Sequence, residues 1–153
     1  MNEIGEIRDL YEGVILEHSR HPRNRRSVAN CTHTARSENP SCGDEVCVFL
    51  AIDDRGIIGD IAFGGKSCAI ATASASLMTE VLAGKTPAQA RILSDHLHAI
   101  ATDGAEAPPD GMEVEIEHLA TLSGLRSFPA REKCAMLPWE TMLAALQSPQ
   151  EGK

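Results

Sequence analysis

Apolar and polar positions in the first 63 residues change from helical to strand spacing. Apolar side chains between residues 4 and 19 recur at intervals of three and four, which predicts an amphipathic helix. Residues 28–37 are polar but favour extended structure, and they predict an edge strand. Dense apolar runs at 45–52 and 57–63 flank Asp-Asp-Arg-Gly, which is typical of a hairpin turn. These patterns predict one helix followed by three strands.

The rest of the chain has helical spacing. Residues 69–83 combine regularly spaced apolar side chains with many Ala and Ser, and Gly84 follows as a helix C-cap. Thr-Pro-Ala-Gln at residues 86–89 is typical of a capping box with proline in the first turn, so it predicts the start of another helix. Residues 113–122 fit both a strand and a helix, of which we favour the helix. A last helix is expected from about residue 138 to residue 147.

Strands that precede helices predict an α+β fold, with a small three-stranded antiparallel sheet and helices packed on one face. The 153 residues are enough for one domain with a substantial core, and we expect that domain to span residues 1–153. Only 3% of the residues are aromatic, so the core must be mainly aliphatic.

The net charge and the N-terminal sequence restrict the possible partners and the compartment. The formal net charge of -8 argues against a nucleic-acid binder, which would carry a basic stripe. No window is apolar enough to cross a bilayer, and the acidic N-terminus lacks the order of a signal peptide. We therefore expect a cytoplasmic protein without a membrane partner. In that compartment, five cysteines indicate metal binding or thiol chemistry rather than structural disulfides.

Four dispersed residues form a candidate metal site: Cys42, Asp44, Cys68 and Cys134. The first two are separated only by a glycine, in the turn-forming sequence Asn-Pro-Ser-Cys-Gly-Asp at residues 39–44. Cys68 stands at the expected start of a helix, whose N–H groups favour a thiolate, and Cys134 follows two basic residues. Thiolates suit zinc, iron and iron–sulfur clusters, and a carboxylate can complete a tetrahedral zinc site. Without Cys-x-x-Cys pairs, we expect an open or exchangeable site rather than a purely structural one.

The remaining cysteines and the histidines are expected to have no ligand role. Cys47 falls in an apolar strand, where a thiol packs as a small hydrophobe, and Cys31 lies in the weaker strand. Six histidines show no metal-ligand spacing and are expected on the surface or on helix faces: His18, His21, His33, His96, His98 and His118.

These residues belong to a longer set of motifs that extends over nearly the whole chain. The motifs are Leu-Tyr at 10–11 with Val-Ile-Leu-Glu-His at 14–18, Pro-Arg-Asn at 22–24, Asn-Pro-Ser-Cys-Gly-Asp at 39–44, Phe-Gly-Gly-Lys-Ser-Cys-Ala-Ile at 63–70, Ala-Ser-Ala-Ser-Leu-Met-Thr at 73–79 and Phe-Pro-Ala-Arg at 128–131 before Cys134. With them the chain resembles the U-type iron–sulfur cluster assembly proteins, the family of IscU, SufU and the N-terminal domain of NifU.

The resemblance is greatest to the SufU branch. Lys133 stands where IscU-type proteins have a histidine, and the stretch between the last two site cysteines is long, as in SufU. The chain departs from the family at Ser19, where a tyrosine is usual, and at Pro138, which interrupts the expected start of the last helix.

The resemblance implies a partner and two competing roles. The partner is a SufS-type pyridoxal-phosphate cysteine desulfurase, which delivers persulfide sulfur. In one role the protein is a zinc-bound sulfurtransferase, in which we expect Cys42 to accept the sulfur and Arg131 to hold the rearranged anionic group. In the other it is a scaffold on which Cys42, Cys68 and Cys134 hold a transient [2Fe–2S] cluster, or iron, for transfer to apo iron–sulfur proteins. A structural zinc adaptor is a third reading, and a monomer or weak dimer is expected.

Overall fold

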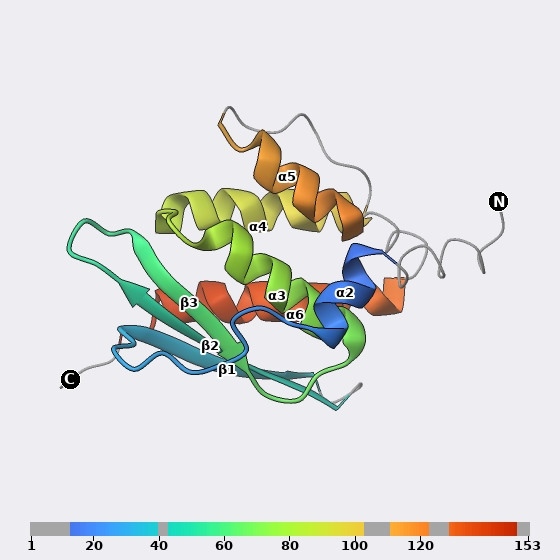
Figure 1. Ribbon diagram of the computed structural model, residues 1–153, viewed down its shortest axis with the longest axis horizontal. Coiled ribbons are helices and arrows are strands. Elements are labelled where there is room, and N and C mark those ends of the chain that lie inside the picture. The colour runs from blue at the N-terminus through green and yellow to red at the C-terminus, as the bar shows by residue number, and fades with distance from the viewer. Residues whose placement is uncertain (1–12, 40–42, 103–110, 123–128, 150–153) are drawn as a thin grey trace, which may run out of the picture.

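The computed structural model describes residues 13–39, 43–102, 111–122 and 129–149. The elements in these ranges are α2 (Val14–Arg20), β1 (His33–Asn39), β2 (Asp44–Ile52), β3 (Ile58–Gly64), α3 (Ala69–Leu82), α4 (Pro87–Thr102), α5 (Glu113–Leu119) and α6 (Pro129–Leu146). Figure 1 shows the strands at one side of the molecule and the helices gathered against them. The predicted α+β fold with a three-stranded antiparallel sheet is confirmed. Within the described ranges, no helix is both long and apolar enough to cross a membrane.

The sheet is built around β2, which pairs with β1 on one edge and β3 on the other. Side chains alternate along β2, so that Val46, Val48 and Leu50 are fully buried under the helices. Cys47 points to the opposite face and is only half-buried. Cys47 therefore lies on the outer face rather than in the core, because the alternation assigns odd-numbered positions of this strand to that face.

Helix α3 is the centre of the helical layer. Twelve of its fourteen residues are buried, and it contacts α2, α5, α6 and β3. Its many Ala, Ser and Thr side chains suit this position, because small residues let neighbouring helices approach closely from several sides. The sequence of a helix that is buried on almost every side has small or apolar residues all round, without the polar face of an amphipathic helix.

Helix α6 corrects the prediction of a last helix beginning at Pro138. The helix begins nine residues earlier, at Pro129, and continues through Pro138 to Leu146. Proline suits the first turn of a helix but removes an N–H in its interior, so the local signal favoured a break at residue 138. All residues from 134 to 139 are buried, and this packing keeps the segment helical through Pro138.

Other boundaries differ by a few residues. Strand β1 begins at His33 rather than at residue 28, and α5 settles the ambiguous segment at 113–122 as a helix. Of the first predicted helix, the part from Val14 is present and runs to Arg20. The remaining part, residues 4–12, lies outside the described residues.

Candidate metal centre

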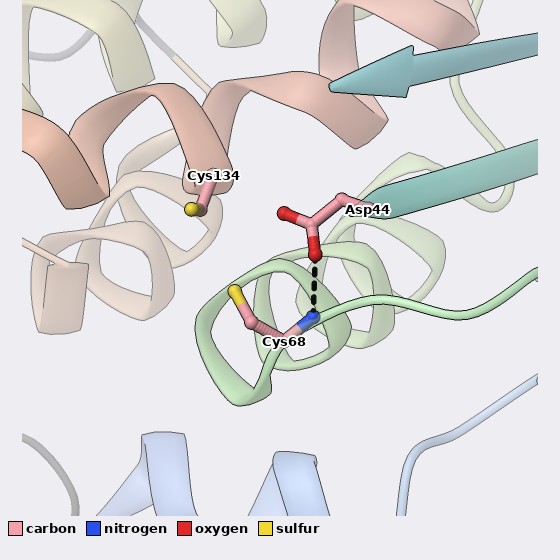
Figure 2. Close-up of side chains that lie close together, drawn as sticks. All are labelled: Asp44, Cys68 and Cys134. Carbon is pink, nitrogen blue, oxygen red and sulfur yellow. Dashed lines mark hydrogen bonds between the residues drawn. The ribbon is translucent and has the colours of Figure 1, made fainter. Parts of the chain in front are cut away.

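Three of the four predicted ligands come together from three different elements. Asp44 is the first residue of β2, Cys68 is the N-cap of α3, and Cys134 lies in the second turn of α6. Their ligand atoms all lie within 4.8 Å of one another, and Figure 2 shows the three side chains pointing toward a common point. The tertiary structure thus brings together residues that are as far apart as 44 and 134 in the chain.

The connection from β3 to α3 sets the position of Cys68. Gly65 has φ +104°, and a Cβ atom there would lie 2.2 Å from the carbonyl oxygen of Glu45, so only glycine allows this close crossing. The N–H of Glu45 donates to the carbonyl of Lys66 at 2.7 Å. These contacts hold the residues before α3 against the start of β2, where Asp44 lies.

Cys68 and Asp44 are joined directly. The N–H of Cys68 donates to Oδ1 of Asp44 at 2.9 Å, as Figure 2 shows. The Cys68 Sγ accepts from the N–H of Ala71 at 3.5 Å, in the position of a helix N-cap. The sulfur therefore sits where the free N–H groups at the start of α3 favour negative charge.

The second carboxylate oxygen of Asp44 indicates what the site is suited to hold. Asp44 is only 4% exposed, and its Oδ2 is buried without a hydrogen-bond partner among the described residues. Buried polar atoms rarely lack a partner, because the loss of solvation costs about 1–3 kcal/mol. An orphaned carboxylate oxygen beside two sulfurs is a donor set that fits zinc or iron.

Two of the predicted site residues, Cys134 and Arg131, differ in burial, and a third, Cys42, lies outside the described residues. Cys134 is buried, whereas Arg131, one helical turn earlier on α6, and the neighbouring Lys133 are exposed. Cys42 lies in residues 40–42, outside the described part of the chain. Gly43, between Cys42 and Asp44, has φ +73°, a backbone conformation that favours glycine.

A cavity of about 420 Å³ lies beside this group. It is bordered by the end of β1, by α4 and by the outer part of α6, and its lining residues include Glu38, Asn39, His98, Lys133 and Leu137. Asn39 pairs with Asp44 across the sheet, and Lys133 precedes Cys134. Residues next to two of the candidate ligands thus line this cavity, whereas Asp44 and Cys134 themselves are buried.

The residues expected to have no ligand role are outside the group. Cys31 is half-buried and donates to the carbonyl of His33 at 3.0 Å. His18 lies on a helix, as expected, and is buried there with only 5% of its surface exposed. Its Nδ1 lies 2.7 Å from Oγ of Ser76, and this hydrogen bond connects α2 to α3. Burial lowers the pKa of His18, and Arg23 nearby lowers it further.

Comparison with known proteins gives consistent matches over this chain. The family described as NifU-like N terminal domain matches residues 10–135. The iron–sulfur cluster assembly scaffold protein IscU of Streptococcus pyogenes serotype M1 is 31% identical over 144 residues, covering 94% of this chain and 87% of that protein. The zinc-dependent sulfurtransferase SufU of Bacillus subtilis is 32% identical over 143 residues, covering 94% and 93%. The crystal structure of a nitrogen-fixing NifU-like protein (N-terminal) from Brucella abortus has a TM-score of 0.81 and 25% identity, covering 93% of this chain and 95% of that one.

Proposed function

This chain belongs to the family of NifU-like N-terminal domains, as its motifs predicted, and we propose that it acts in iron–sulfur cluster biogenesis as a zinc-dependent sulfur acceptor. The donor of the sulfur is a SufS-type cysteine desulfurase. The observation that carries the proposal is the convergence of Asp44, Cys68 and Cys134, with an unpartnered carboxylate oxygen beside two sulfurs. Such a donor set suits zinc.

The ligands in this proposal are Cys42, Asp44, Cys68 and Cys134. Only Gly43 separates Cys42 from Asp44 in the chain, so a fourth donor is available next to the three that converge. Zinc, when bound, would keep its cysteine ligands as thiolates, the form in which sulfur is a nucleophile. Cys68 is held at the start of α3 and Cys134 is buried in α6, which leaves Cys42 as the proposed acceptor.

The transfer step is a thiol–disulfide type of exchange. The thiolate of Cys42 attacks the terminal sulfur of the desulfurase persulfide, a new S–S bond forms on Cys42, and the desulfurase cysteine leaves as a thiolate. Arg131 is exposed on α6 one turn before Cys134. Its guanidinium is the proposed partner for the anionic group that forms, because its fixed fork of donors pairs well with anions.

The second candidate function is a scaffold that assembles a [2Fe–2S] cluster and passes it to apo iron–sulfur proteins. It is favoured by the relatives that are named as IscU scaffolds, and by the fact that thiolates also bind iron and its clusters. A structural zinc adaptor is the third candidate. All three use the cysteines of one site, and the zinc-binding functions add Asp44, so they differ in chemistry rather than in location.

Desulfurase turnover distinguishes these functions. For a sulfur acceptor, adding the zinc-loaded protein strongly raises cysteine turnover by a SufS-type desulfurase, and Cys42→Ala abolishes the increase. Cys31→Ala is the matched control, because Cys31 lies outside the group. A scaffold supports cluster reconstitution with little change in turnover, and an adaptor gives neither effect.

The site of the transferred sulfur is found by mass spectrometry after incubation with desulfurase and cysteine. The proposal expects an additional sulfur on Cys42. A persulfide on Cys134 and none on Cys42 would contradict the assignment and favour the scaffold.

A further inference from the structure

The two described cysteines of the candidate site belong to different helices, so the separation of their sulfurs depends on how α3 packs against α6. Cys68 precedes the first turn of α3, and Cys134 lies in α6. The two helices contact each other, and Figure 1 shows α6 running behind α3. Any shift of one helix along the other would change the distance between the two sulfurs.

A chain of two buried hydrogen bonds connects these helices. Ser74 of α3 donates its hydroxyl to the carbonyl of Ala135 at 2.6 Å. Trp139 of α6 donates its indole N–H to the same Ser74 oxygen at 3.1 Å. All three residues are fully buried, so no solvent can replace a bond that is lost, and the pairing resists movement of the helices.

The contact lies immediately beside the candidate ligand of α6. Ala135 directly follows Cys134, and Ser74 lies six residues after Cys68, which is about 9 Å along α3 at the usual rise per residue. Pro138 is four residues after Cys134 and has no N–H to donate to its carbonyl. The carbonyl of the residue after Cys134 is the one that accepts the bond from α3.

We propose that Ser74 and Trp139 act as positioning residues, which set the separation of the Cys68 and Cys134 sulfurs and thereby the affinity of the site for its ion. The proposal rests on the proposed function only for the identity of that ion. If Ser74 had only a structural role, removing its hydroxyl would lower the stability of the fold as the removal of any other buried hydroxyl does.

Thr141 offers a matched control for that comparison. It is fully buried on α6, and its hydroxyl donates to the carbonyl of Leu137 at 2.7 Å within the same helix. Ser74→Ala and Thr141→Val each remove one buried hydroxyl, but only Ser74→Ala removes a bond between helices. Trp139→Phe removes the indole N–H and keeps the bond from Ser74 to Ala135.

The first experiment needs no metal. In a chain with Cys31, Cys42 and Cys47 replaced by serine, phenylarsine oxide joins two thiols through its arsenic atom with release of water. Its binding is measured by mass spectrometry in competition with dithiothreitol. Ser74→Ala is expected to weaken capture by at least about tenfold, the usual scale for removing a supporting hydrogen bond at such a site. Trp139→Phe is expected to have a smaller effect, and Thr141→Val to stay within about twofold of the parent, because it leaves the helix contact intact.

The second experiment measures zinc affinity in the otherwise natural chain, by competition with a chromophoric chelator. The same order of variants is expected, while urea unfolding of the metal-free proteins shows similar losses of stability for Ser74→Ala and Thr141→Val. If Ser74→Ala does not fold, Trp139→Phe decides the result against Thr141→Val. Failure of the parent chain to bind zinc would refute the proposed function, and arsenical capture would still test the positioning role. Equal capture and equal zinc affinity for the Ser74, Trp139 and Thr141 variants would refute the positioning role.

Discussion

Replacing Asp44 by asparagine is expected to have opposite effects in the metal-free and zinc-bound protein. The two side chains have nearly the same shape, and asparagine keeps the oxygen that accepts from the N–H of Cys68. The change replaces the buried Oδ2, which has no partner among the described residues, with an amide NH₂ beside two sulfurs. The NH₂ group can donate to sulfur but cannot bind a cation.

The expected magnitudes follow from that geometry. In the metal-free protein, relieving the unsatisfied oxygen raises the free energy of unfolding by about 1–3 kcal/mol. With free zinc at about 1,000 times the dissociation constant, binding adds about 4 kcal/mol to the parent protein. Loss of a ligand is expected to weaken affinity by at least about a hundredfold, since even outer hydrogen-bond partners cost 10–100-fold. At the same free zinc, at most about 1.4 kcal/mol of the added stability then remains.

Urea unfolding in a chelator and in a zinc buffer measures both effects in one series. Glu45→Gln is the matched control, because it removes the same charge from the next residue, which is half-buried on the other face of β2 and pairs with Arg36. We expect this control to keep the zinc response of the parent. The reasoning is refuted if Asp44→Asn lowers the stability of the metal-free protein, or if it keeps the full response to zinc.

Two further predictions test the surroundings of the site. Burial lowers the pKa of His18 below the ordinary 6.5, so the unfolded chain binds that proton more readily than the folded one, and stability is lost as the pH falls below that value. We therefore expect His18→Gln to flatten the fall of the urea midpoint between about pH 7.5 and 5.5 in the metal-free protein, and an equally steep fall in this variant would contradict the reasoning. Gly65→Ala is expected to cost more than about 3 kcal/mol in urea unfolding, because its Cβ would lie 2.2 Å from the Glu45 carbonyl. Gly84→Ala, with a similar positive φ but open space around it, should cost only about 1–2 kcal/mol, and equal losses for the two would contradict the steric argument.

Local sequence patterns were sufficient for most of the elements. The alternation at β2, the turn before β3 and the capping box before α4 depend on neighbours a few residues apart, and the structure confirms all three elements. The place of Cys68 at the start of α3 was predicted for the same reason. The four candidate ligands were chosen from cysteine chemistry and from the family motifs.

Tertiary packing decided the features that no local pattern carries. Helix α6 runs through Pro138 because its neighbours bury that segment, and the partner of the buried His18 is a serine of α3, Ser76. The sequence contains both sulfurs of the site, but their separation depends on the contact between α3 and α6, and the lone Oδ2 of Asp44 depends on what surrounds it. Backbone preferences act over one or two turns of chain, whereas a donor set drawn from residues 44, 68 and 134 exists only after the sheet and two helices have packed together.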